Sequence, residues 1–131
     1  MDCSLFRKLG DPIWGIELAS YHVVDANAAA LEFSGFSLDE LVMRTLYDLY
    51  APHAVQRILR HCLPYQDSGV SVAPYRAGIL PCVKKDGTIG HLEVYCHLIN
   101  AGGRRLLYLQ GKRLQAVMGT VTAERAEKRI A

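Results

Sequence analysis

Histidine and cysteine side chains offer the most obvious chemistry in this sequence of 131 residues. Both can bind a metal ion, and Cys96 stands directly before His97. Adjacent residues of a β-strand point to opposite faces of the sheet, however, so these two side chains cannot reach one ion. The four cysteines, Cys3, Cys62, Cys82 and Cys96, form no C-x-x-C pair. We therefore predict no metal site.

Motifs of the common enzyme classes are absent from the sequence. It contains no G-x-S-x-G nucleophile elbow, Walker loop or dinucleotide-binding fingerprint. Gly102 and Gly103 precede a predicted strand, so they lack the helix N-terminus that holds a phosphate. The adjacent carboxylates of Asp39 and Glu40 suit helix capping better than acid–base catalysis. The sequence predicts a non-catalytic domain.

The charge balance of the chain is nearly even. Its 15 lysine and arginine residues against 13 aspartate and glutamate residues give a net charge of +2, and the basic residues are scattered. Phosphate-driven binding has little to act on, so we expect no nucleic-acid partner. No run approaches the roughly 20 apolar residues that span a bilayer, and the N-terminus lacks the order of a secretory signal. Most cysteines lie among apolar neighbours, which favours a reducing, cytoplasmic location.

Length and patterning predict one α+β domain between two short terminal segments. A chain of 131 residues, 50% of them hydrophobic, can bury one core. We expect strands over residues 13–18, 21–24, 75–85, 88–100 and 104–112, and helices that begin near residues 26, 37 and 52. The predicted organisation is a flap helix over residues 1–12, the domain over residues 13–113 and a C-terminal helix over residues 114–131.

Turn and cap residues mark the ends of these elements. Gly35 ends the first helix of the domain, because glycine adopts the left-handed conformation without strain. Ser37 and Glu40 have the spacing of a capping box at the start of the next helix. Asp86–Gly87 is a favoured hairpin pair. Pro81 interrupts the strand before this hairpin, so we expect an edge position or a bulge there.

Alternation along the predicted strands assigns side chains to two faces of a sheet. After the hairpin, Leu92, Val94 and Cys96 share one face, whereas Tyr95 points to the other. In the helix that begins near residue 52, the apolar face is centred on Cys62. The predicted core or pocket lining is Ile58, Cys62, Leu92, Val94, Cys96, Leu107 and Leu109.

Two segments give the chain its resemblance to the PAS family. The run D-A-N-A-A-A-L-E-F-S-G-F-S-L-D-E-L covers residues 25–41, and K-K-D-G-T covers residues 84–88. The resemblance implies a five-stranded antiparallel sheet with short helices on one face. Together they enclose a pocket that holds haem, flavin, organic acids or nothing in different members. It also implies that Asn27 opens its helix, since a short amide can accept from free backbone N–H groups.

The resemblance suggests two cofactors to test against the sequence. Haem-binding members present an inward-facing histidine from the long helix, which here points to His61. His61 falls about a quarter-turn to one side of the apolar face, so the alternative is an ordinary flanking histidine. Light-sensing members carry a reactive cysteine in the short helix that corresponds to residues 44–49, where this chain has none. A photoactive flavin is therefore not expected, and the identity of any cofactor stays open.

The outer face of the predicted sheet resembles the surface that PAS members use for pairing or for docking helices. Exposed aromatic and aliphatic side chains on one sheet face usually mark an interaction surface. The alternative is that the chain's own terminal helices cover this face, and both can hold in a dimer. The candidate docking residues are Leu5, Phe6, Trp14, with Ile16 as its alternative on the first strand, Tyr95 and Tyr108.

The function implied by the resemblance is sensory input to a larger signal-transduction regulator. Histidine kinases of two-component systems, cyclic-dinucleotide enzymes and transcription factors are the expected outputs, with the output domain following residues 114–131. The domain would bind a small ligand in its core, form a homodimer, or both. One alternative is a ligand-free dimerisation or docking module, and another is a haem-based gas or redox sensor that uses His61. Many members couple the last strand to the outgoing helix through an Asp-Ile-Thr triplet, which residues 111–114 lack.

Overall fold

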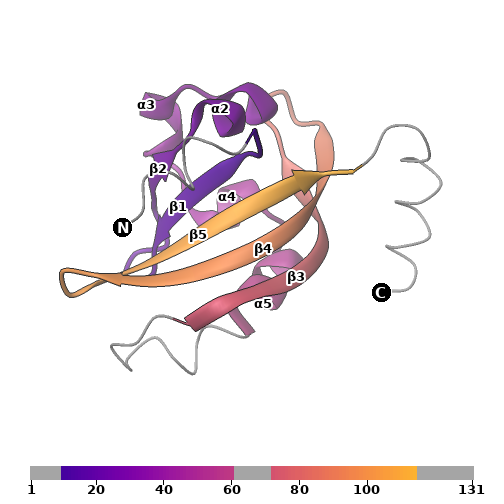
Figure 1. The fold of residues 1–131 in the computed structure, drawn as a ribbon. Helices are drawn as coiled ribbons and strands as arrows, with labels where there is room; N and C mark the ends of the chain where they lie inside the picture. The colour runs from indigo at the N-terminus through magenta and orange to yellow at the C-terminus, as the bar shows by residue number, and fades with distance from the viewer. Residues whose placement is uncertain (1–9, 61–71, 115–131) are drawn as a thin grey trace.

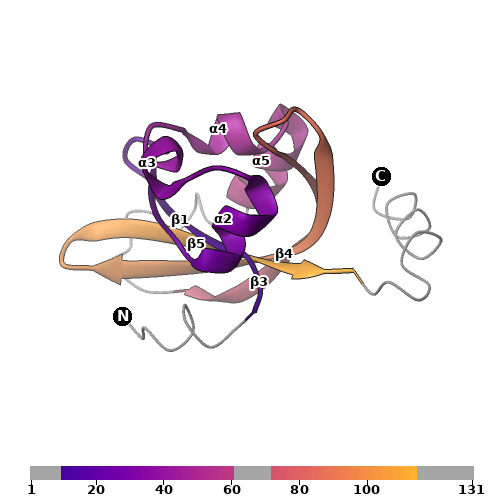
Figure 2. The same cartoon turned by 90° about the horizontal axis from the view of Figure 1, so that it is seen from above.

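The computed structural model describes residues 10–60 and 72–114 of the chain. Within them, one antiparallel sheet has the strand order β2-β1-β5-β4-β3, and short helices cover one of its faces (Figures 1 and 2). The predicted α+β fold is confirmed. The elements are β1 (Ile13–Glu17), β2 (Val23–Ala26), α2 (Ala28–Ser34), α3 (Leu38–Leu41), α4 (Leu46–Leu49), α5 (Pro52–Arg60), β3 (Val72–Val83), β4 (Ile89–Ala101) and β5 (Arg104–Arg113).

The predicted cap residues are all confirmed. Asn27 opens α2, and its Oδ1 accepts the N–H of Ala30 at 2.9 Å. Gly35 ends the same helix with a φ of +82° in the left-handed region. At the start of α3, the Ser37 N–H donates to Glu40 Oε1 at 2.9 Å while the Glu40 N–H donates to Ser37 Oγ at 3.2 Å. These local bonds fix where the chain turns between short helices.

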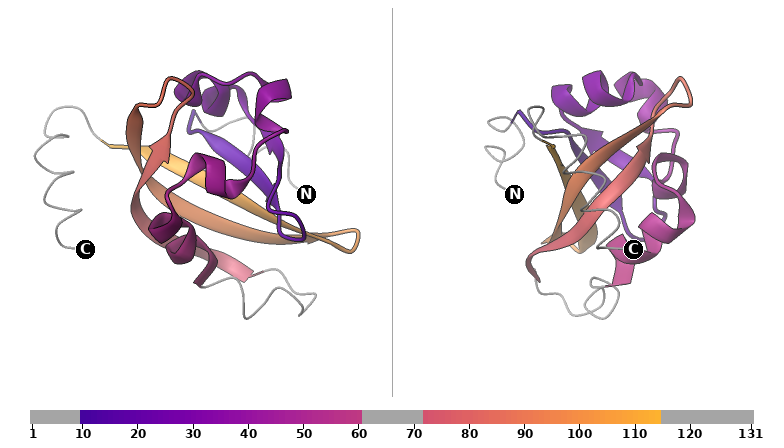
Figure 3. Two further views of the ribbon diagram at one scale, coloured as in Figure 1. Left: turned by 180° about the vertical axis from the view of Figure 1, so that it is seen from behind. Right: turned by 90° about the vertical axis from the view of Figure 1, so that its right-hand side faces the viewer.

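The β3–β4 hairpin packs on the end of α2, which brings the two PAS-like segments together. The Lys85 N–H donates to the Ser34 carbonyl at 2.9 Å, and Lys85 Nζ lies 2.7 Å from Glu40 Oε2. The turn itself is the predicted one, with Gly87 at a φ of +86°. Figure 3 shows, from behind and from the side, the helical layer and the sheet that this contact joins.

Strand register places one set of side chains on the inner face of the sheet, toward the helices. Trp14 lies opposite Leu109, which lies opposite Cys96 on the next strand. Directly opposed residues share a face, so Trp14 and Ile16 both point inward and are fully buried. The prediction that Trp14 lies on the outer docking face was therefore wrong. β1 has isoleucines at both parities, and alternation alone could not decide its register.

The β1–β2 connection is longer than the gap between the two predicted strands, residues 19–20. β1 ends at Glu17 and β2 begins at Val23, with Tyr21 between them at a φ of 62°. β2 also extends to Ala26, where we expected helix. At the opposite edge of the sheet, β3 is an edge strand, as the proline at position 81 predicted. The irregular pairing of β3 with β4 lies earlier in the strand, near Gly78.

Three hydrogen bonds clasp the segment before β1 to the end of β5. The Gly111 N–H donates to the Pro12 carbonyl at 2.8 Å. Arg113 Nη1 donates to the Gly10 carbonyl at 2.7 Å, and Gln110 Nε2 donates to Asp11 Oδ2 at 3.1 Å. We call these contacts the terminal clasp. The predicted flap and C-terminal helix lie outside the described residues, apart from residues 10–12 and 114.

Candidate ligand site in the core

The inner sheet face and the helices enclose one apolar core. Every described member of the predicted lining belongs to its buried cluster: Ile58, Leu92, Val94, Cys96, Leu107 and Leu109. On α5, the buried residues Val55, Ile58 and Leu59 confirm the predicted helix face, whereas His53 is exposed. Cys62 and His61 lie outside the described residues. The proposed haem ligand therefore stays a prediction.

Two hydrogen-bond donors in this core have no partner. Trp14 Nε1 and Tyr50 Oη are both buried, and neither makes a hydrogen bond to any group in the structure as described. Their rings meet edge to face, with centroids 6.5 Å apart. An unpartnered buried hydroxyl or N–H group costs roughly 1–3 kcal/mol. Both unpartnered donors thus belong to neighbouring rings of the core.

Tyr50 is held in place by two elements. It caps α4, where its N–H donates to the Leu46 carbonyl at 3.1 Å, and its backbone forms an isolated antiparallel bridge with Cys82 of β3. The Cys82 side chain is close enough for each group to affect the other's pKa. Thiols are weak hydrogen-bond partners, however, and the geometry for a bond to Tyr50 Oη is not met. We therefore regard the hydroxyl as unpartnered.

The buried side chains of the described core carry no charge at neutral pH. Burial raises the pKa of the Tyr50 hydroxyl well above 10, and it raises the pKa of the Cys82 thiol to about 12. Both groups stay protonated, since desolvation disfavours their anions. The buried polar residues in the described ranges are Asn27, Ser34 and Gln110, and none of these is ionisable. The described part of the core therefore offers hydrogen-bond donors and no charged group to a ligand.

The described core contains few side chains that could bind a cofactor. Among residues 10–60 and 72–114, no histidine belongs to the buried cluster, and no group of three or more His, Cys, Asp or Glu side chains is placed to hold a metal ion. The helix α4 has the sequence LYDL, without the cysteine that a photoactive flavin needs. The described core therefore supplies neither a histidine ligand for haem nor that cysteine, and the identity of any cofactor stays a prediction.

Sequence reasoning missed both unpartnered donors. Trp14 was assigned to the wrong face, and Tyr50 was not singled out. A signal for Tyr50 was present, because Leu46, Leu49 and Tyr50 have the spacing of one helical face and all are fully buried. The pattern could have shown that the tyrosine points inward. It could not have shown that the hydroxyl lacks a partner, which depends on β3 more than 20 residues away.

The outer sheet face differs from the exposed docking surface that we expected. Tyr108 does point outward, in a separate cluster with Ile13 and Leu106, but it is only 3% exposed. Tyr95 is half-buried, with Lys112 Nζ 4.9 Å from its ring centre. Leu5 and Phe6 lie outside the described residues. This face is therefore already covered at Tyr108, and the alternative that the terminal helices cap it concerns residues outside the described ranges.

A series of side-chain hydrogen bonds crosses this outer face and ends at the terminal clasp. His97 Nε2 lies 3.0 Å from Gln110 Oε1, and Gln110, only 6% exposed, donates in turn to Asp11. The predicted outward orientation of His97, opposite to that of Cys96, is consistent with this bond. Cys96 is buried in the core instead.

No helix in the described part of the chain combines the length and apolar character needed to cross a bilayer.

Comparison with solved structures finds the same fold in domains of low sequence identity. A PAS domain from Colwellia psychrerythraea is 19% identical, with a TM-score of 0.64 over 84% of this chain and 92% of that one. The PAS domain of nitrogen regulation protein NR(II) from Vibrio parahaemolyticus is 18% identical, with a TM-score of 0.63 over 85% and 95%. A domain of a sensory box sensor histidine kinase/response regulator from Geobacter sulfurreducens is 20% identical, with a TM-score of 0.61 over 83% and 89%.

Comparison of the sequence itself with known proteins also points to the PAS fold. No curated protein matches the chain. The sequence profile of the PAS fold matches residues 4–111, which include every described strand and helix except the last residues of β5. Together with the strand order and the capped helices, this match is decisive: the chain belongs to the PAS family.

Proposed function

We propose that this PAS domain senses a small, uncharged and mainly apolar molecule that binds in its core. The observation that carries the proposal is the pair of buried donors, Trp14 Nε1 and Tyr50 Oη. A carbonyl, ether or hydroxyl oxygen between them would accept from both. The rest of the ligand would contact aliphatic side chains such as Leu109 and Ile58.

The absence of charge in the described core argues for a neutral ligand. A buried carboxylate or ammonium group is costly unless it is paired and hydrogen-bonded. The described core offers two neutral donors and a protonated thiol, and no cation. A neutral acceptor gains two hydrogen bonds without that cost, because it is not ionised in water either. The ligand class that fits is therefore a small ketone, quinone, ester or alcohol.

We also propose that the domain serves as the input module of a larger signalling protein. PAS domains are sensory modules, and the Geobacter relative is by name a domain of a sensor histidine kinase/response regulator. The terminal clasp supports this role, since it ties the end of β5 to the segment before β1. Such a tie can replace the coupling that the missing Asp-Ile-Thr triplet provides elsewhere.

The test is to identify what the core holds in freshly purified protein. Native mass spectrometry should find a small molecule bound to the wild-type domain, and organic extraction with mass analysis should identify its class. Tyr50→Phe removes one donor and keeps the ring, so it should bind the same molecule more weakly. The spectra also report whether the domain is a homodimer, and an absorption spectrum would reveal any haem or flavin.

Tyr47→Phe is the matched control. Tyr47 lies on α4, the helix that Tyr50 caps, but it is 54% exposed and outside the core. It should retain the ligand at the wild-type level. If the wild-type domain carries no small molecule and binds none from a panel of neutral carbonyl compounds, the proposed ligand function is wrong. A bound ligand that is equally lost in both variants would contradict the assigned role of Tyr50.

A further inference from the structure

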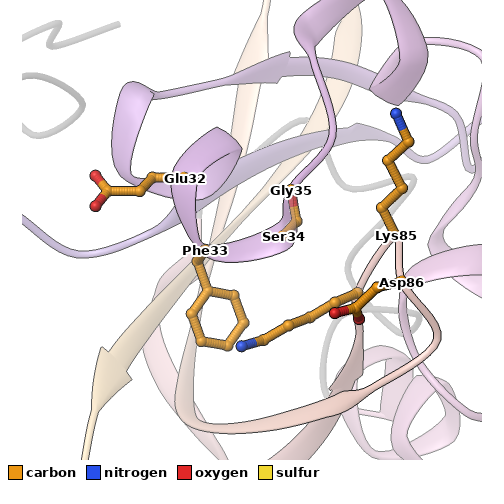
Figure 4. A pocket seen from close by; sticks show the side chains of 7 residues that line it. Glu32, Phe33, Ser34, Gly35, Lys85 and Asp86 are labelled. Atoms are coloured by element: carbon orange, nitrogen blue, oxygen red, sulfur yellow. The ribbon is translucent and has the colours of Figure 1, made fainter.

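A surface pocket lies above the core, between the end of α2 and the β3–β4 hairpin (Figure 4). Its volume is about 520 Å³, and it is open to solvent. The ring of Phe33 projects from α2 into this space, whereas the side chain of Lys85 points away from it (Figure 4). The lining residues are Glu32, Phe33, Ser34, Gly35, Lys84, Lys85 and Asp86.

Phe33 separates this pocket from the core. On its inner side it meets Trp14 edge to face, with centroids 6.3 Å apart. On its outer side Lys84 Nζ lies 4.6 Å from the ring centre, a cation–π distance. Since Trp14 also contacts Tyr50, the three rings form a series from the surface pocket to the two unpartnered donors.

The Phe33 ring rests on bare backbone. A Cβ atom at Gly90 would lie 2.5 Å from Phe33 Cζ and 2.8 Å from Lys84 Cε, so only glycine leaves room for this stack. Phe33 is half-buried, and no hydrogen bond can hold a phenyl ring. A rotation about its side-chain bonds would therefore open a path to Trp14 without moving the sheet.

We infer that this pocket is the entrance to the core site and that the Phe33 ring, covered by Lys84, closes it. The inference rests on the proposed function, because it assumes a ligand that reaches the core. The pocket lining includes two lysines and the carboxylates of Glu32 and Asp86. Glu40, which pairs with Lys85 at the rim, adds a third carboxylate. An entrance of this charge admits neutral molecules more readily than anions. That preference matches the uncharged core.

The single tryptophan of the chain reports on this path without any ligand. Trp14 is fully buried, so acrylamide, a neutral quencher, and iodide, an anionic one, should both quench its fluorescence weakly in the wild-type domain. Phe33→Ala removes the closure. It should raise quenching by acrylamide severalfold and quenching by iodide much less.

Phe36→Ala is the matched control. Phe36 lies just beyond Gly35, is 8% exposed and also packs on the core, with Arg44 5.0 Å from its ring centre, but it does not line the pocket. Its loss should leave quenching near the wild-type level. An equal rise in both variants would mean general loosening and would overturn the inference. So would a folded Phe33→Ala variant with unchanged acrylamide quenching.

A gentler pair of variants covers the case in which Phe33→Ala does not fold. Lys84→Gln and Arg44→Gln each remove a cation from one phenylalanine ring. Only the first should increase acrylamide quenching, and equal values for the two would refute the inference. Because quenching requires no ligand, this result is independent of whether mass spectrometry finds a bound molecule.

Discussion

Replacement of Tyr50 by phenylalanine should stabilise the ligand-free domain. The hydroxyl is fully buried and unpartnered, and such a group costs roughly 1–3 kcal/mol. Its removal leaves a space smaller than a methyl group, so the gain should be about 1 kcal/mol. That free energy corresponds to a melting temperature roughly 3–6 °C higher for a domain of this size. The variant should also bind the proposed ligand up to about tenfold more weakly, because one hydrogen bond is lost.

The assay is urea unfolding of the wild type and the variant after the ligand has been removed. Tyr47→Phe should change the free energy of unfolding by less than about 0.5 kcal/mol, as exposed sites usually do. The pH dependence adds a second check. Burial raises the pKa of Tyr50 in the folded state above its ordinary value of 10.0. Ionisation of this group therefore leaves the stability of the wild type unchanged below pH 10 and lowers it as the pH rises further, because the unfolded state releases the proton more readily. The advantage of the variant should therefore grow in alkali.

The result that would refute this reasoning is a ligand-free variant that is less stable than the wild type by more than about 1 kcal/mol. It would mean that the hydroxyl has a stabilising partner in the folded protein. The Cys82 thiol is the neighbour to test, and Cys82→Ala combined with Tyr50→Phe in a double-mutant cycle would measure their coupling. A coupling near zero would leave the hydroxyl unpartnered.

Three further outcomes are expected. Gly35→Ala should lower the free energy of unfolding by about 1 kcal/mol because its φ of +82° strains a side chain, whereas Gly35→Asn should cost less; equal costs would contradict the strain. The Lys85 hydrogen bond lowers the pKa of Glu40 from 4.5 to about 2, so the stability lost in Glu40→Gln should be seen above pH 4.5 and should vanish as the pH falls to about 2. Cys82 and Cys96 are buried; with the other two cysteines replaced by serine, a thiol reagent should react only at the rate of unfolding, and fast reaction would show an open core.

Short-range chemistry made the ends of the elements predictable. Asn27, Gly35, and the pair Ser37 and Glu40 each act on backbone groups within a few residues, and the structure places all of them as expected. The inward alternation of β4 was also readable, because one face of that strand is apolar and the other carries Glu93 and His97. Local sequence carries that information in full.

Features that depend on contacts across the sheet could not be read in the same way. β1 is apolar on both faces, so only its pairing with β5 shows which side Trp14 occupies. The extent of the β1–β2 connection depends on Tyr21, a bulky residue that rarely adopts a positive φ. The surface pocket requires the hairpin at Lys84 to meet the end of α2 at Phe33, and those residues are about fifty positions apart.

The terminal clasp has a mechanical consequence. β1 and β5 are antiparallel, with Ile13 opposite Gln110, so Gly10 and Arg113 leave the sheet at the same end. Tension between these two points loads the pairs one after another, like a zipper, instead of all at once. Each step is worth only a hydrogen bond or two, and the first strand to peel away carries Trp14 with it. A pull on the chain would thus open the core at Trp14 early in unfolding.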